Sequence, residues 1–401
     1  CTAGHPVCDL QGICESSGFI TNTCIPEACW DAGLPPTIDA GPVDARADAS
    51  ATDDAMQFPD AAPGTTSFAP VVGSDLSAND RFGSTVAIDG DTAVFGASGA
   101  VYVFSWNNGS WGAGIKLKPL EATGFGTSIG ISGTTMVVGA ASEAYVFEQS
   151  AQGFWIQGNR LTSGVSYDSF GQNVAIDGDI IVVGAPGDDA IATNSGAVHI
   201  FRRNSINGSW DLESVERQPS PASGDFFGSK VTVNGTYVAG QGLLKTHVFE
   251  YAGGTTWTSS SAYSGGNSIS ISGSVLAIGK SSTNVNTGSV LIYRRTGAVT
   301  WSLEATLTAS DAATYARFGS AIALDGTRVV VGAPTHEPDG RIYSFANSGA
   351  SWTEHPESLI PPQVGNGDEY GHAVALSGNR IAIGAPGDAS MAGSGFIASL
   401  P

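Results

Sequence analysis

The sequence predicts an all-β fold, a ring of four-stranded antiparallel sheets that are each encoded by one copy of a repeated segment. Three observations lead to this prediction. The phrase RFGSTVAIDGDTAVFGA at residues 81–97 returns almost unchanged as RFGSAIALDGTRVVVGA at residues 317–333. Glycine is abundant (54 of 401 residues) and only 13% of the residues are charged, which is typical of short strands joined by tight turns. Further copies recur with a period of about 48 residues, as in propellers and repeat arrays.

The copies share an aromatic–glycine pair, which is followed about fourteen residues later by a second glycine. Three copies extend the second glycine to Gly-Ala-Pro, at residues 184–186, 332–334 and 384–386. One degraded copy has Gly265-Gly266 in place of the pair. The aromatic residues of the other six copies are Phe82, Phe125, Phe170, Phe227, Phe318 and Tyr370.

Each copy is predicted to form four strands. In the first copy, STVAI alternates in polarity and ends at Asp89-Gly90, a two-residue hairpin signal, and TAVFGA returns as the second strand. Residues 100–104 give a third strand, and a turn containing Asn108-Gly109 leads into a fourth. Four antiparallel strands make one propeller blade.

The two ends of the repeat region complete each other. The last copy stops after its third strand at residues 395–400, whereas residues 65–73 resemble a fourth strand without a copy of its own. Pairing the two would complete a seventh blade and remove its open edge. The sequence therefore predicts a seven-bladed β-propeller over residues 65–401, with the last blade closed by an N-terminal strand.

The segment before the repeats differs in composition. All five cysteines lie within residues 1–30, and the four at Cys8, Cys14, Cys24 and Cys29 predict a small disulfide-rich segment with its pairing open. A zinc site is the alternative, but the usual Cys-x-x-Cys pairs are missing. Residues 31–64 are mostly Asp, Ala, Gly and Pro, which predicts a flexible, disordered linker.

The remaining cysteine, Cys1, opens the sequence. A chain that begins with Cys and continues into a flexible stretch resembles a bacterial lipoprotein after signal cleavage. That resemblance implies acyl chains on Cys1 and a place at the cell surface or outer membrane, outside the cytoplasm. The alternative is an arbitrary chain boundary at this residue.

Phe-Gly followed by Gly-Ala-Pro resembles the FG-GAP repeats that form the seven-bladed propeller of integrin α subunits, over residues 65–401. The resemblance implies that the aromatic residues pack between blades and that the glycines allow neighbouring backbones to approach. The family has calcium loops between first and second strands, but this sequence has two-residue turns there. We therefore do not expect the family's calcium sites in this protein. Asp89 and Asp177 are interpreted as turn residues.

Composition and residue spacing also argue against some classes of function. With 17 basic and 37 acidic residues, the formal charge of −20 disfavours nucleic acid as a partner. The six histidines share no spacing with a nucleophile, and the first strands carry small apolar or hydroxyl residues, with Lys230 and Asn173 as exceptions. We therefore expect no enzyme activity and no cofactor.

Function is expected in the loops, on the face shared by the connections between blades and those between second and third strands. The interpretation is a surface-anchored recognition or adhesion module that binds a protein or polysaccharide, and a merely solvated acidic rim is the alternative. Asp188, Asp189 and Asn194 leave a weak calcium site open. The candidate ligand-binding residues, all expected to be exposed, are Tyr167, Asp168, Asp188, Asp189, Asp225, Tyr315, Asp339 and Asp368.

Two other functions stay open. A lectin-like propeller would bind sugars between blades through a tryptophan that recurs on the fourth strands, although packing between blades is the favoured role for it. The second alternative is a structural subunit of a coat or filament. The sequence does not predict the oligomeric state. The recurring residues are Trp111, Trp155, Trp210, Trp257, Trp301 and Trp352.

Overall fold

The computed structural model describes residues 66–120, 122–165, 168–349, 351–356, 359–361 and 364–400, with the backbone of two short strands near the N-terminus. These are β1 (Val7–Cys8) and β2 (Cys14–Glu15), which pair antiparallel with Cys8 opposite Cys14. The chain divides into two units, Cys1–Gln57 and Phe58–Pro401. The side chains of the predicted disulfides, the lipid anchor at Cys1 and the linker lie outside the described part of the chain, and these three stay predictions.

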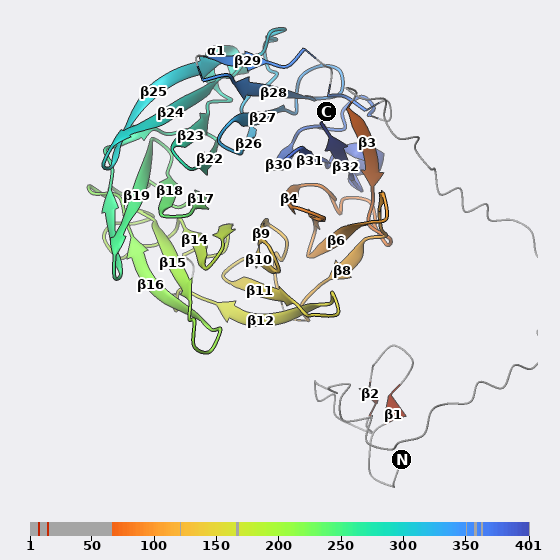
Figure 1. Cartoon of the computed structure of the whole chain (residues 1–401), viewed down its shortest axis with the longest axis horizontal. Coiled ribbons are helices and arrows are strands. Elements are labelled where there is room, and N and C mark those ends of the chain that lie inside the picture. The colour runs from red at the N-terminus through yellow and green to blue at the C-terminus, as the bar shows by residue number, and fades with distance from the viewer. Residues whose placement is uncertain are drawn as a thin grey trace, which may run out of the picture. The chain divides into compact units, whose positions relative to one another are not determined.

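Within residues 66–400, the described strands form seven antiparallel sheets that follow one another around a closed ring (Figure 1). The first strands of neighbouring blades contact each other all the way round. The strands of blades 1 to 3 are β4 (Thr85–Asp89), β5 (Thr92–Ala97), β6 (Ala100–Asn107), β7 (Ser110–Trp111) and β8 (Ile115–Leu117); β9 (Ser128–Ser132), β10 (Thr135–Gly139), β11 (Ala144–Gln149) and β12 (Trp155–Leu161); and β13 (Asn173–Asp177), β14 (Ile180–Ala185), β15 (Ala197–Arg203) and β16 (Trp210–Glu216).

Blades 4 to 7 repeat this order, with two one-turn segments, α1 (Thr283–Asn286) and α2 (Asp388–Met391), between second and third strands. Their strands are β17 (Lys230–Asn234), β18 (Tyr237–Gln241), β19 (Lys245–Gly253), β20 (Thr256–Ser259) and β21 (Tyr263–Ser264); β22 (Ser268–Ser272), β23 (Val275–Gly279), β24 (Val290–Gly297) and β25 (Thr300–Leu307); β26 (Ala321–Leu324), β27 (Arg328–Ala333), β28 (Arg341–Asn347) and β29 (Trp352–Glu354); and β30 (Ala373–Ser377), β31 (Arg380–Ala385), β32 (Ser394–Ser399) and β3 (Ser67–Val71).

The N-terminal strand closes the ring, as the sequence predicts. Strand β3 pairs antiparallel with β32, from Ser67 opposite Ser399 to Val71 opposite Gly395. Blade 7 therefore has the order β3-β32-β31-β30, with one strand from the beginning of the repeat region and three from its end. The prediction of a seven-bladed all-β ring is confirmed.

Burial follows the position of a strand in its blade. All six residues of β14 are buried, because the second strand lies between the two neighbouring blades. The strand consequently reads as a continuous apolar run, IIVVGA, rather than an alternating one. The outer strand β16 instead exposes Asp211 and Leu212, since only one side of it faces protein.

The repeated aromatic residues fill the spaces between blades. Phe82 is fully buried, stacks on Phe95 with 5.3 Å between ring centroids, and shares a core with Ala382 and Ile397 of blade 7. The other five aromatic residues are at most 1% exposed. The predicted packing role is confirmed for Phe82, Phe125, Phe170, Phe227, Phe318 and Tyr370.

The two glycines of the motif meet across the blade boundary. A Cβ added to Gly184 of blade 3 would lie 1.9 Å from the carbonyl oxygen of Gly228, which belongs to the aromatic–glycine pair of blade 4. Such a contact is far inside van der Waals distance, so the second glycine of one blade is required by the first glycine of the next. The same contact occurs between Gly139 and Gly171, Gly279 and Gly319, Gly332 and Gly371, and Gly384 and Gly83.

The turns between first and second strands are the two-residue hairpins that the sequence predicts, and they also link blades. The backbone N–H of Gly133 donates to Asp89 Oδ2 at 2.7 Å, and that of Gly235 donates to Asp177 Oδ2. Side chains at the equivalent position accept similar bonds, so hydrogen bonds connect the tips of neighbouring blades. The other pairs are Gly178 with Ser132, Gly273 with Asn234, and Gly90 with Ser377.

The recurring tryptophans pack between blades. Trp210, Trp257 and Trp301 are 5%, 7% and 4% exposed. The indole N–H of Trp257 donates to Glu213 of the preceding blade at 2.9 Å. Their ring faces are therefore not available for stacking on a sugar, and the packing interpretation is confirmed for these three residues.

Candidate functional site

The propeller has two faces, which we define by their connections. Each first strand runs away from the face that carries the connections between blades and those between second and third strands, called the loop face here. The opposite face carries the tight turns between first and second and between third and fourth strands, and we call it the turn face. The seven first strands surround the centre of the ring (Figure 1), and we call the space that they line the central channel.

The loop face buries three of the acidic residues that the sequence suggests as exposed ligands. Asp168, Asp188 and Asp368 are 1%, 4% and 9% exposed, so the expectation of exposure is wrong for these residues. Their carboxylates serve the loops internally. Asp168 Oδ1 accepts the N–H of Phe170 at 3.1 Å, and Asp368 Oδ2 accepts the N–H of Gly365. Burial raises the pKa of Asp368.

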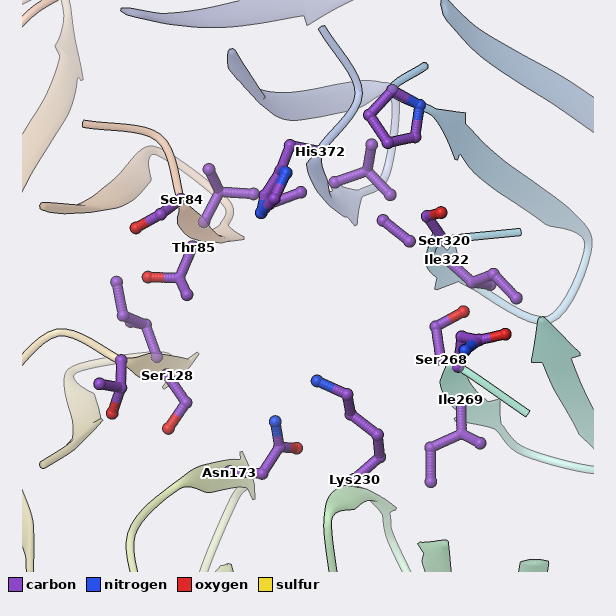
Figure 2. Close-up of a pocket in the computed structure, with 18 of the residues that line it drawn as sticks. Ser84, Thr85, Ser128, Asn173, Lys230, Ser268, Ile269, Ser320, Ile322 and His372 are labelled. Carbon is purple, nitrogen blue, oxygen red and sulfur yellow. The ribbon is translucent and has the colours of Figure 1, made fainter. Parts of the chain in front are cut away.

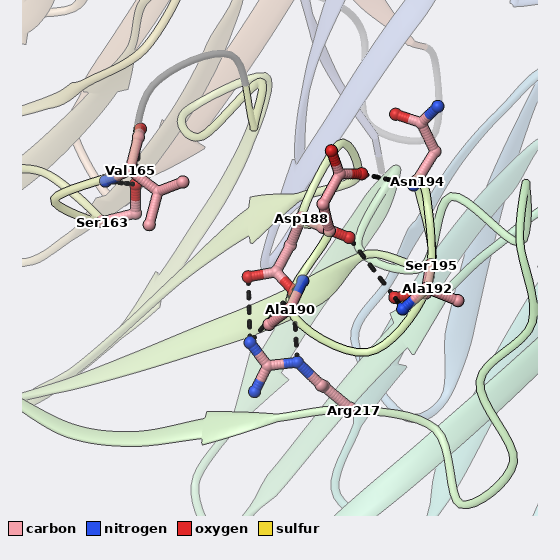
Figure 3. Close-up of polar contacts among 9 residues, drawn as sticks. Ser163, Val165, Asp188, Ala190, Ala192, Asn194, Ser195 and Arg217 are labelled. Carbon is pink, nitrogen blue, oxygen red and sulfur yellow. Dashed lines mark hydrogen bonds and ion pairs between the residues drawn. The ribbon is translucent and has the colours of Figure 1, made fainter.

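Asp188 is held by an arginine from a distant part of its blade. Both of its carboxylate oxygens accept hydrogen bonds from the Arg217 guanidinium, at 2.9 Å and 3.0 Å, and Oδ1 also accepts the N–H of Ala190 (Figure 3). Asp189 accepts the N–H of Asn194 at 2.6 Å. Arg217 thus neutralises one of the three residues of the weak calcium site that the sequence leaves open. The described residues contain no group of three or more His, Cys, Asp or Glu side chains arranged to hold a metal.

The remaining predicted residues differ in exposure. Asp225 is half-buried and accepts hydrogen bonds from Gln218 and from the backbone N–H of Ala222. Asp339 is half-buried, whereas Asp189 and Tyr315 are exposed. Tyr167 lies outside the described residues. The structure therefore leaves Asp189, Tyr315 and part of Asp339 facing solvent as the sequence predicts.

Beneath Asp168 and Asp188 lies a buried histidine. His199 is 5% exposed and packs edge-on against Phe170, with 5.2 Å between ring centroids. Neither ring nitrogen has a hydrogen-bond partner among the described residues. Burial lowers the pKa of His199 to about 4, although the two carboxylates favour its charged form.

This histidine predicts acid sensitivity. Its pKa in the folded protein is below its ordinary value of 6.5, so its neutral form stabilises the fold above pH 6.5 and that contribution is lost as pH falls toward 4. The shift corresponds to about 3 kcal/mol. We expect the free energy of unfolding, measured with urea, to drop by about that much more in the wild type than in His199→Phe between pH 7.5 and pH 4. Equal pH dependence of the two proteins would contradict this role, since all other titrations are common to both.

A feature that the sequence analysis missed is the apolar surface of the loop face. Fifteen large apolar side chains are exposed in the described residues, and nine of them stand on connections of this face. Leu243 and Leu244, between β18 and β19, are 62% and 76% exposed. These residues are isolated apolar residues within polar loops. They form no periodic pattern, so the sequence did not predict this surface. The other seven are Val72, Leu120, Val165, Ile191, Val285, Tyr315 and Met391.

The central channel is a second candidate site. It encloses a cavity of about 470 Å³ that residues from the first strands of all seven blades line. Most of its hydroxyl groups are already committed. Thr85, Ser128 and Ser268 donate to backbone carbonyls of the next blade at 2.9, 3.2 and 2.8 Å.

Charged side chains gather where the channel opens on the loop face. His372 and Glu369 line the cavity, and Arg81 pairs with Glu369 at 2.9 Å. His372 Nδ1 lies 3.3 Å from the same carboxylate oxygen of Glu369. Burial lowers the pKa of His372, and the charges of Arg81 and Lys230 lower it further. These residues come from opposite ends of the sequence and meet only because the ring closes.

Lys230 and Asn173 project into the cavity side by side from the loop-face ends of β17 and β13 (Figure 2). Solvent reaches Lys230 through the channel, but the surrounding walls withhold part of its hydration, and this burial lowers the pKa of Lys230. Asn173 Oδ1 accepts the N–H of Val231 at 2.9 Å, which turns the amide NH₂ toward the cavity. The sequence singled out both residues as exceptions, without a role for either.

The helices described, α1 and α2, have four residues each, and neither is long and apolar enough to cross a membrane.

Comparisons with known proteins agree with this architecture. A search of curated protein sequences gave no match. A chain in a crystal structure of the mitotic checkpoint complex is similar in fold, with a TM-score of 0.56 and 12% identity over 92% of this chain and 99% of that one.

A family model described as FG-GAP repeat matches residues 66–110, 155–201, 301–350 and 352–397. These segments contain the repeated motif whose aromatic residues and glycines form the blade boundaries. The chain is therefore a seven-bladed β-propeller built from FG-GAP repeats.

Proposed function

We propose that this propeller is a non-enzymatic recognition and adhesion module that binds a protein partner through its loop face. The FG-GAP propeller is a fold associated with recognition rather than catalysis. The observation that carries the proposal is the concentration of exposed apolar side chains on the loop face, nine of the fifteen in the described residues. Exposed apolar groups within a polar rim are typical of protein interaction sites.

A protein partner is favoured over a polysaccharide by the position of the aromatic residues. Sugars commonly stack on aromatic ring faces that are open to solvent, but Trp210, Trp257 and Trp301 are buried between blades, and Tyr315 is the one aromatic residue among the nine exposed apolar side chains of the loop face. Leucine, isoleucine and valine side chains such as Leu243, Leu244 and Ile191 instead suit the apolar centre of a protein interface. The cell surface is the proposed location.

The test compares two double variants that each replace two exposed leucines. Leu243→Ser with Leu244→Ser alters the loop face, whereas Leu212→Ser with Leu303→Ser alters outer strands, where the side chains are 52% and 55% exposed. Proteins captured from cell-surface extracts by the wild type are identified and purified, and their affinities for each variant are measured by surface plasmon resonance. We expect at least tenfold weaker binding for the loop-face variant, or about 1.4 kcal/mol, and unchanged binding for the control.

Equal losses in both variants, or in neither, would contradict binding through the loop face. Removal of the captured material by glycosidase rather than protease treatment would show that the ligand is a polysaccharide. Circular dichroism spectra of both double variants and the wild type, at the same concentration, verify that each protein keeps its fold.

A further inference from the structure

The central channel contains a cation that lacks a counter-ion. The Lys230 ammonium forms no ion pair or hydrogen bond within the described part of the chain, although the protein carries a formal charge of −20. Glu369, the carboxylate among the residues that line the cavity, pairs with Arg81 at 2.9 Å and lies 3.3 Å from His372. Arg317 is also among the residues that line this cavity, and it forms no ion pair in the described ranges.

The two donors beside each other in the channel have a fixed arrangement. Because Asn173 Oδ1 is held by the N–H of Val231, its Nδ2 is the group left to face the cavity next to Lys230 (Figure 2). An ammonium and an amide NH₂ together present donors to both oxygens of a carboxylate. The low-dielectric walls focus the positive potential of Lys230 and Arg317 into a narrow opening.

The polarity of the channel gives the direction from which a ligand enters. Lys230 and Asn173 begin their strands, so they lie at the loop-face end, together with Arg317 and Arg81. The opposite end of the same strands carries carboxylates at the turns, Asp89, Asp177 and Asp325. Within the channel, Lys230 therefore places an unpaired positive charge at the loop-face end, whereas carboxylates lie at the turn-face ends of the first strands.

We propose that the loop-face opening of the central channel is a carboxylate site in which the Lys230 ammonium and the Asn173 amide receive an acidic side chain of the protein partner. This inference rests on the proposed function of the loop face. The exposed apolar residues lie on the connections of the same face, and the carboxylate would add a charged anchor to the apolar contacts. Fully desolvated charge pairs at the centre of an interface contribute specificity and slow dissociation.

The test observes Lys230 directly. The sequence contains only five lysines, so reductive methylation with ¹³C-formaldehyde, which keeps the positive charge, gives few NMR signals. The probes are acetyl-Gly-Glu-Gly-amide, the matching Gln peptide and sodium acetate. We expect a saturable shift of the Lys230 signal with the Glu peptide, no saturation with the Gln peptide, and only an ionic-strength response at exposed Lys118.

Three variants sharpen the test. Lys230→Met should weaken binding of the Glu peptide at least tenfold, followed by the NMR signals of the peptide. Lys118→Met removes the same charge outside the channel and should bind as the wild type does. Asn173→Asp keeps an oxygen that accepts the Val231 N–H but places a carboxylate beside Lys230, so it should abolish binding and shift the Lys230 signal in the absence of probe.

Parallel shifts of Lys230 and Lys118 with every probe, or wild-type binding by Asn173→Asp, would overturn the proposal. Tighter binding of acetate than of the Glu peptide would also overturn it, because the site would then take a small free acid. The Leu243→Ser with Leu244→Ser variant separates the two proposals. If that variant loses the captured protein but the wild-type channel shows no carboxylate response, the inference fails while the proposed function stands.

Discussion

A chain that begins at residue 73 is expected to lose cooperative folding, because this truncation removes β3 from blade 7. Strand β3 supplies the outer ladder of β32, from Ser67 opposite Ser399 to Val71 opposite Gly395. Val71 is 6% exposed and belongs to the core that also contains Phe82 and Phe95 of blade 1. The truncation therefore affects both the last blade and its contact with the first.

The expected loss is large on the scale of protein stability. Burial of Val71 contributes about 1.5–3 kcal/mol, and each hydrogen bond of the ladder contributes about 0.5–1.5 kcal/mol. Their sum is about 5 kcal/mol, comparable with the whole free energy of unfolding of many domains. Differential scanning calorimetry and urea unfolding should show either no transition or a strongly lowered midpoint, and the exposed edge of β32 should promote association.

The matched control begins at residue 58, where the second unit of the chain starts. It lacks the cysteine-rich segment but keeps β3, so we expect it to unfold at the same temperature as the full chain. A synthetic peptide of residues 64–73 should restore part of the stability of the shorter chain. Indistinguishable melting of the two truncated chains would show that β3 does not close the ring.

The fold could be predicted because the constraints that create it are local and repeated. The aromatic residue of six copies, the two glycines and a glycine-containing turn recur in fixed order, and each has the same conformational role wherever it occurs. Even the closing strand was visible, since residues 65–73 resemble a fourth strand and the last copy lacks one. The resemblance implied that glycines let neighbouring backbones approach, but which glycines meet, such as Gly184 and Gly228, could not be predicted because the contact joins residues of neighbouring copies.

The site was harder to predict because its contacts join residues far apart in the sequence. Asp188 seemed a free carboxylate, but Arg217, 29 residues later, neutralises it. Arg81 and Glu369 are 288 residues apart and meet only at the closure of the ring. Lys230 and Asn173 did stand out from the apolar first strands, yet only the hydrogen bond between Asn173 and Val231 shows which group faces the channel.

The replacement Gly184→Ala is expected to destabilise the propeller by about 3 kcal/mol or more, the second large effect. The new Cβ would lie 1.9 Å from the carbonyl oxygen and 2.9 Å from the carbonyl carbon of Gly228. Both groups are backbone within packed blades, so relief requires blades 3 and 4 to separate. Separation would in turn loosen Phe227, which is fully buried at that boundary. Overpacking of this kind typically costs about 1–3 kcal/mol, and more where the backbone must move.

The control is Gly158→Ala in the outer strand β12. Its new Cβ would meet only the carbonyl oxygen of Val146, at 3.7 Å, which is an ordinary van der Waals contact. We expect the free energy of unfolding of this variant to lie within about 1 kcal/mol of the wild-type value. It could be slightly higher, because alanine restricts the unfolded chain. Urea unfolding of the two variants measures the difference, which isolates the close approach of the blades from the general effect of adding a methyl group. Equal stabilities would show that the boundary yields easily and that the paired glycines of the motif are not required by steric contact.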